Sequence, residues 1–226
     1  MFRNLMYILI TLCIVLSSTN TEAGRKRGPK SGKIKKGIFV DNKYDFEVVI
    51  VEKWKGKTQK ENSICRLTIT FERNKSDIRT DIAGVDGFEL STPFISFWVI
   101  ETDVSCRDYL DNFLKNPTAS KTNKKIITMM QASWTDMNFK HFKTWTYSKF
   151  SIDDRKGVNW VGLLNSNYKS SDADLLYQLY TIFDCIQMDD KTILFIAGRT
   201  EPEHFNKISG QLQYIMRSVK WAKVIE

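Results

Sequence analysis

The stretch from residue 175 to residue 221 constrains the fold most, because two strand patterns and a helix pattern follow one another with short turns between them. Residues 176–187 are mostly apolar on both alternating faces, which is typical of a strand that is covered on both sides. Residues 188–191 supply a turn, and residues 192–197 (TILFIA) predict the returning strand of a hairpin.

A helix is expected directly after this hairpin. Thr200, Glu203 three residues later and Pro202 in the first turn together make the pattern of a capping box. Five apolar residues then recur at helical spacing and predict one buried face: Phe205, Ile208, Leu212, Ile215 and Met216. The predicted unit is strand, turn, strand, helix, and we expect the earlier chain to pack on it.

The earlier chain predicts mainly antiparallel strands. Strand patterns occur at residues 38–40, 44–54, 65–73, 94–102, 126–130, 142–150 and 158–164. In the third of these, alternation places Leu67, Ile69 and Phe71 inward, and Arg66, Thr68, Thr70 and Glu72 toward solvent. Residues 74–92 and 121–125 are expected to be loops.

One helix is expected in the middle of the chain. Ser105 with Asp108 three residues later predicts its N-terminal cap, and Asn116-Pro117 predicts its end. Its buried side is expected to carry Tyr109, Leu110, Phe113 and Leu114. The order of elements therefore predicts a single α+β domain, residues 38–226, in which an antiparallel sheet is flanked by helices.

The N-terminus has the pattern of a signal peptide. Arg3 precedes a twelve-residue apolar run at residues 5–16, and a polar stretch ends at Ala23, a small-residue cleavage site before Gly24. A twelve-residue helix spans only about 18 Å, short of a hydrocarbon core of about 30 Å. We therefore expect residues 1–23 to be removed on export to the periplasm or medium. Membrane anchoring stays open as the alternative, because basic residues directly after an apolar run oppose export.

A run of basic residues follows the expected cleavage site. Residues 24–37 contain seven basic side chains and no acid, and without them the net charge of +8 falls to about +1. The seven are Arg25, Lys26, Arg27, Lys30, Lys33, Lys35 and Lys36. With four glycines and a proline among them, they predict a flexible tail. The tail is expected either to contact an anionic lipid surface, nucleic acid being the less favoured partner, or to be a solvated leader.

The cysteines do not predict a metal site. Cys65, Cys106 and Cys185 are far apart and lack the CxxC spacing of zinc ligands. Three free buried thiols are expected, with one disulfide plus a free thiol as the alternative. Cys106, at the start of the predicted helix, would have a somewhat activated thiol if it were exposed.

Residues typical of catalytic sites are few. His204 is expected to be a solvated helix residue and His141 a surface residue, and neither lies in an HExxH motif. There is no GxSxG motif, while a Cys106–His141 pair stays open because such partners meet in space and not in sequence. The carboxylate pairs at residues 153–154, 172/174 and 189–190 fall in expected turns. We expect no catalytic, cofactor or metal site.

Two stretches resemble PsbP-like domains. Residues 37–54 (GIFVDNKYDFEVVIVEKW) resemble the family's entry, where a short strand leads into a Y-x-F strand that ends at a tryptophan. Residues 192–221 resemble its closing strand and helix, followed by a short segment that ends at Trp221. The resemblance implies an α/β/α sandwich and a non-enzymatic accessory or protein-binding role. It supplies no active-site residue.

These observations together predict an exported, non-catalytic accessory or binding protein that engages a protein partner or an anionic surface. The alternative is a secreted hydrolase with a site assembled from scattered polar residues.

Overall fold

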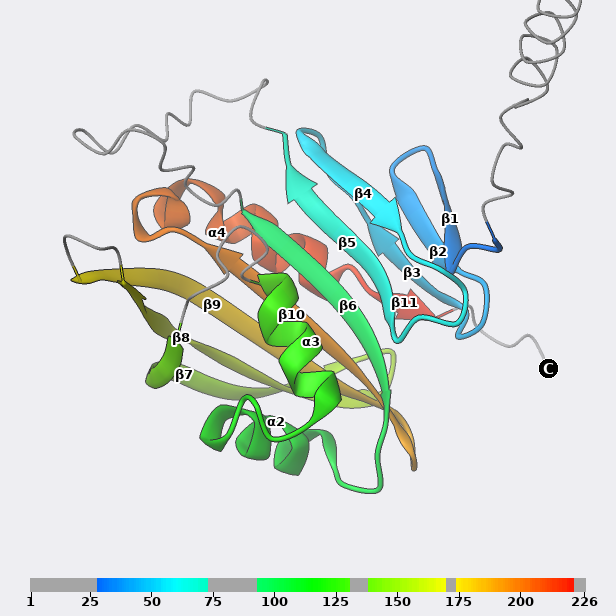
Figure 1. Ribbon diagram of the computed structural model, residues 1–226. Helices are drawn as coiled ribbons and strands as arrows, with labels where there is room; N and C mark the ends of the chain where they lie inside the picture. Colours follow the sequence, from blue (N-terminus) through cyan, green and yellow to red (C-terminus); the bar gives the residue numbers. More distant parts are fainter. Residues whose placement is uncertain (1–27, 73–92, 131–137, 170–173, 222–226) are drawn as a thin grey trace, which may run out of the picture.

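The computed structural model describes residues 28–72, 93–130, 138–169 and 174–221 of the 226-residue chain (Figure 1). Within these ranges the strands form two sheets, and every strand pair in them is antiparallel. The large sheet has the order β4-β5-β6-β10-β9-β8-β7: β4 (Trp54–Thr58), β5 (Cys65–Phe71), β6 (Phe94–Glu101), β7 (Asn138–Ile152), β8 (Arg155–Lys169), β9 (Asp174–Asp189) and β10 (Thr192–Thr200). The small sheet has the order β1-β2-β3-β11: β1 (Gly32–Lys35), β2 (Ile38–Asp41), β3 (Phe46–Val49) and β11 (Lys220–Trp221).

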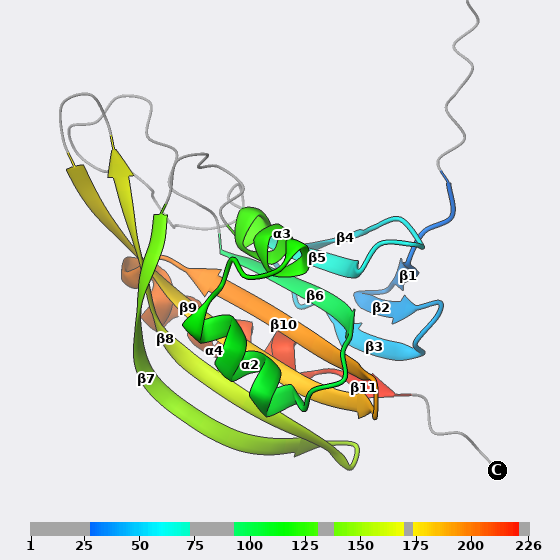
Figure 2. The same ribbon diagram turned by 60° about the horizontal axis from the view of Figure 1, so that its bottom comes forward.

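Three helices among the described residues cover the large sheet. α2 (Cys106–Lys115) and α3 (Lys121–Met130) lie on one face, while α4 (Pro202–Arg217) and the small sheet lie on the other (Figures 1 and 2). Each face has its own apolar core. The expected α+β class, an antiparallel sheet flanked by helices, is confirmed.

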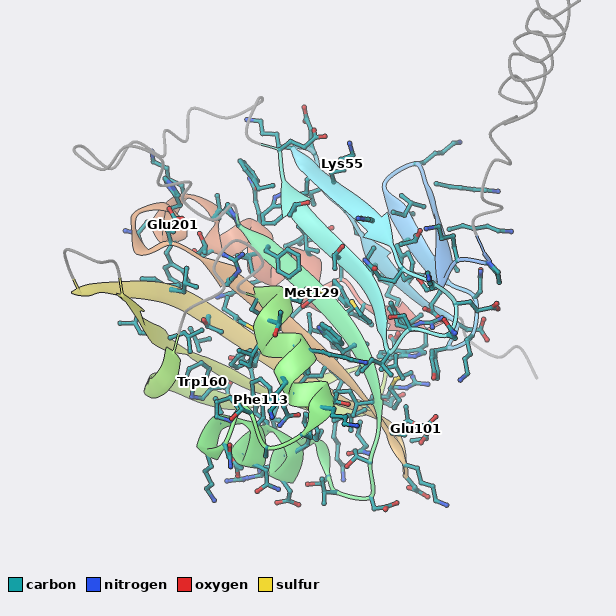
Figure 3. All side chains as sticks on the ribbon, in the orientation of Figure 1. Lys55, Glu101, Phe113, Met129, Trp160 and Glu201 are labelled. Carbon is teal, nitrogen blue, oxygen red and sulfur yellow. The ribbon has the colours of Figure 1, made fainter. Side chains whose placement is uncertain are left out.

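The core beneath α2 is aromatic. The rings of Phe113 and Phe183 meet edge to face with centroids 5.2 Å apart, and Trp160 stacks on Phe183 at 5.4 Å. Phe113 and Trp160 are labelled in Figure 3, on the side of the sheet that carries α2. Aromatic pairs at such separations add stability beyond the area that they bury.

The strongest sequence patterns are confirmed. β9 and β10 form the predicted hairpin, and β6 is buried on both faces along residues 94–100. Ser105 caps α2 by accepting a hydrogen bond from the backbone N–H of Asp108. In α4, Ile208, Leu212, Ile215 and Met216 are buried as predicted, and Phe205 is half-buried.

The loop and strand predicted between residues 121 and 130 are wrong, because these residues form α3. The Ser120 hydroxyl accepts a hydrogen bond from the backbone N–H of Asn123 and so begins the helix. Asn123, Ile126, Ile127 and Met130 are buried, which is the i, i+3, i+4, i+7 spacing of one helical face.

The single strand predicted over residues 44–54 is two strands. β3 ends at Val49 in the small sheet, and β4 begins at Trp54 in the large one. Lys53, with a φ of 68°, lies at the bend between them.

The predicted capping box of α4 is also wrong. Glu201 is the N-cap, without a side-chain cap hydrogen bond, because Thr200 is the last, buried residue of β10. No helix among the described residues is long and apolar enough to cross a bilayer.

Candidate functional site

The basic segment predicted to be a flexible tail is ordered in its second half. Arg25, Lys26 and Arg27 lie outside the described residues, whereas Gly32–Lys35 forms β1 and Lys30 forms an isolated bridge with Lys60. The prediction is therefore wrong for this half.

The turn between β1 and β2 could have been predicted from the sequence, but the basic residues around it indicated a flexible tail instead. Lys36 and Gly37 connect β1 to β2 with φ angles of 48° and 76°, and two central residues at positive φ are the requirement of a tight type I′ hairpin turn. A Cβ added to Gly32 would lie 2.5 Å from the Phe39 ring, so only glycine fits there without a shift. The turn and the close approach together fix β1 against β2.

The strand register brings some of these lysines together with apolar residues. Directly opposed residues of paired strands project from the same face of a sheet. Lys33 opposes Val40, Lys35 opposes Ile38, and both pairs lie on the side of the sheet away from buried Phe39. The register continues this side across β3 and β11, and we call it the outer face: Lys33, Lys35, Ile38, Val40, Glu47, Val49 and Lys220.

The outer face is basic and partly apolar. Ile38 is 39% exposed and Val40 38% exposed, and each lies beside a lysine of β1. Glu47 is its single acid against three lysines. Within the described part of the chain, none of these three lysines forms an ion pair. Lys30 and Lys36, also exposed, extend the positive charge at the β1 end.

A buried ion pair fixes the small sheet to the large one. Arg66 of β5 donates to Asp41 of β2 from Nε at 2.7 Å and from Nη2 at 3.2 Å. Its remaining donors reach the backbone carbonyls of Ser31, Glu61 and Ser63. All five guanidinium donors are therefore used, and the pair is almost fully removed from solvent.

Arg66 was predicted to face solvent, and this is wrong. The register between β5 and β6 shifts between Cys65 and Leu67, so Arg66 lies at a bulge. An extra residue in one strand breaks the alternation of faces and re-aims its side chain. Asp41 is held in turn by the backbone N–H groups of Lys43 and Tyr44. Thr68, also predicted to be exposed, is buried.

The three cysteines in the described residues are free and buried, as expected. Burial raises the pKa of Cys65 to about 12 and the pKa of Cys185 well above its usual value. The pKa of Cys106 is instead lowered to about 7, chiefly by a side-chain hydrogen bond with Cys185. No local sequence pattern indicates that Cys106 and Cys185 lie close together.

One of the two histidines, His204, does not lie as predicted. His204 is 5% exposed and not solvated, because the start of α4 packs into the buried end of β10. Its Nε2 lies 3.6 Å from a carboxylate oxygen of Glu201, which is also buried. His141 is on β7, and its side chain lies outside the described part.

The described acidic pairs lie in turns, as predicted. Asp153 and Asp154 connect β7 to β8, and Asp189 and Asp190 lie at the β9–β10 turn. Residue 172 lies outside the described residues, and Asp174 begins β9. In the part of the chain that the structure describes, no three His, Cys, Asp or Glu side chains gather as a metal site would need.

No family model and no curated protein matches the chain. Among solved structures, cyanobacterial PsbP from Synechocystis matches 87% of this chain and 96% of its own, with 10% identity and a TM-score of 0.49. LpqN, involved in cell envelope biogenesis of Mycobacterium tuberculosis, matches 77% of this chain and 82% of its own, with 9% identity and a TM-score of 0.46. The likeness is one of fold, and no functional residue is transferred from either protein.

Proposed function

We propose that this chain is an exported, non-catalytic accessory protein that docks on an anionic lipid surface through the outer face of its small sheet. The proposal rests on exposed Lys33 and Lys35, which form no ion pair within the described residues and lie beside exposed Ile38 and Val40 on one face. Export rests on the apolar run at residues 5–16 and the small-residue site that ends at Ala23.

Charge supplies the first part of the interaction. A lysine near an anionic membrane contributes about 1 kcal/mol, and the effect decays within a Debye length. Lys33, Lys35 and Lys220 share the outer face, and the other five basic residues of residues 24–37 are close to Lys33 and Lys35 in the sequence. Such a surface attracts anionic headgroups. Glu47 is the one acidic residue of the outer face that repels them.

Apolar contact supplies the second part and favours a lipid surface over nucleic acid. Full burial of an isoleucine side chain is worth about 1.5–3 kcal/mol, so burying the exposed two fifths of Ile38 or Val40 contributes about 1 kcal/mol each. Apolar residues among lysines suit the boundary between headgroups and acyl chains.

The test is binding of the full-length chain to phosphatidylglycerol vesicles and to phosphatidylcholine vesicles. The readout is the difference between the two, because the apolar run at residues 5–16 contributes to both. Lys33→Ala with Lys35→Ala removes about 2 kcal/mol, so affinity for the anionic vesicles should fall about 30-fold. Deletion of residues 24–37 is a poorer test, because it removes β1 as well as charge.

The matched control is Lys124→Ala with Lys125→Ala. These two exposed lysines lie on α3, on the opposite side of the large sheet, and their removal changes the net charge equally. The control should change affinity less than threefold. Equal losses in both double variants, or no preference for anionic vesicles in the unaltered chain, would overturn the proposal.

A further inference from the structure

Two of the three described cysteines meet where α2 begins. Cys106 is the first residue of α2, and Cys185 lies on β9 opposite Val158 of β8. Both side chains belong to the apolar cluster beneath α2, and Gln187, two residues from Cys185 on β9, accepts a hydrogen bond from the backbone N–H of Cys106. Cys65 lies on β5 instead, where its Sγ contacts the backbone of Leu67 and the sulfur of Met129. The described residues therefore contain one pair of neighbouring thiols and one separate buried thiol.

A cavity of about 470 Å³ opens beside this pair. Cys106 lines it together with residues from α2, β7, β8 and β9: Arg107, Lys149, Phe150, Lys156, Val158 and Gln187. The backbone N–H of Cys106 donates to the side-chain oxygen of Gln187 at 2.8 Å, which fixes the start of the helix over β9. Cys106 is thus held at the wall of a cavity, and Cys185 is completely buried behind it.

We propose that Cys106 and Cys185 form a reactive dithiol at this cavity, which hydroperoxides oxidise to a disulfide. Cys106 is the attacking thiol, because it lines the cavity. Cys185 is the resolving thiol, because it lies in the same buried cluster as Cys106 and has no exposed surface.

The reaction proceeds in two balanced steps. The Cys106 thiolate attacks the terminal oxygen of the hydroperoxide, the O–O bond breaks, and an alcohol leaves after taking up a proton, so that Cys106 becomes a sulfenic acid. The Cys185 thiol then attacks the Cys106 sulfur, the S–O bond breaks, and water leaves as the disulfide forms. The cysteines lose two electrons, and the peroxide gains them.

The charge distribution assigns these roles in the same way. The hydrogen bond from Cys185 stabilises the Cys106 thiolate, and a thiol with a pKa of about 7 is half ionised at neutral pH. Burial keeps the proton on Cys185. The other charged groups around the pair are Arg107, Lys149 and Lys156 at the cavity and Asp184 beside Cys185.

The test uses the full-length chain, treated in the folded state with hydrogen peroxide, alkylated and digested with trypsin. Each of the four cysteines falls in its own tryptic peptide: residues 4–25 for Cys13, 61–66 for Cys65, 80–107 for Cys106 and 170–191 for Cys185. We expect the last two peptides to be recovered joined, lighter by two hydrogens than their sum, and released by a reducing agent.

Two variants separate the roles. Cys185→Ala should leave a sulfenic acid on Cys106 that a 1,3-dione traps, whereas Cys65→Ala, the matched control, should form the linked peptides at an unchanged rate. Cys106 should be consumed at least tenfold faster than Cys65. If the folded chain yields no linked peptides, or if Cys65 is oxidised as fast as Cys106, the proposal is wrong; both readouts come from the unaltered chain and do not depend on any variant folding.

Discussion

Replacing Arg66 with methionine tests how the small sheet is held in place. The substitution keeps an unbranched side chain but removes five hydrogen bonds, two of them to Asp41. Among the described residues, Asp41 then keeps only its two backbone donors, in a site with almost no solvent access. Removing one partner of a buried ion pair costs about 3–5 kcal/mol, because the remaining charge stays buried.

The assay is urea unfolding followed by tryptophan fluorescence. With a slope of about 2 kcal/mol per M, a loss of about 3–5 kcal/mol lowers the midpoint by about 1.5–2.5 M. Arg107→Met is the matched control, because it breaks a largely exposed pair with Asp111 at 3.8 Å, and such pairs are worth less than about 1 kcal/mol. A loss below about 1 kcal/mol in Arg66→Met, or equal losses in the two variants, would show that the buried ion pair does not hold the small sheet in place.

Three further predictions concern packing, pH and processing. Gly198→Ala should destabilise the fold by about 1–2 kcal/mol, because the added Cβ would lie 2.5 Å from a methyl group of α4. Gly210→Ala, where the added Cβ would lie in open space on α4, should instead stabilise the fold by about 0.5–1 kcal/mol. Thermal unfolding of both variants checks these two changes. Burial raises the pKa of Asp184 to about 6 from an unfolded value near 3.8, so unfolding free energy should fall as the pH rises between about 4 and 6. Asp184→Asn should abolish this fall in unfolding free energy between about pH 4 and 6. At pH 7 the variant should be more stable than the unaltered protein by up to about 3 kcal/mol, as measured by urea titration. If the fall persists in the variant, another group causes it. The intact mass of the protein isolated from its host should be that of a chain beginning at Gly24. The mass of a chain beginning at Met1, found in a membrane fraction, would contradict export.

The sequence predicts elements best where one local pattern decides them. β6, β9 and β10 are apolar on both faces because helices or the second sheet cover both sides, so their composition alone marks them as central. α2 has an unambiguous cap and a proline after its end. The prediction for α3 was wrong because Ile126 and Ile127 fit the start of a strand equally well. The helical spacing becomes visible only when buried Asn123 is counted with the apolar residues.

The site depends on contacts that local patterns do not contain. β1 is rich in lysine, and its strand character comes from the turn at Lys36 and Gly37 and from pairing with β2. The burial of Arg66 follows from a bulge and a carboxylate 25 residues away. Cys106 and Cys185 meet only through the packing of α2 on β9. Residue identity gives the charge and the chemistry, and tertiary structure decides which groups share a face.

The most direct test of docking through the outer face is a hydrogen–deuterium exchange footprint of the protein on phosphatidylglycerol vesicles. We expect slower amide exchange in residues 30–41 and 47–49, with α3 unchanged, and loss of this protection on phosphatidylcholine vesicles or at high salt. Protection confined to α3 or β7, or spread evenly over the chain, would contradict it.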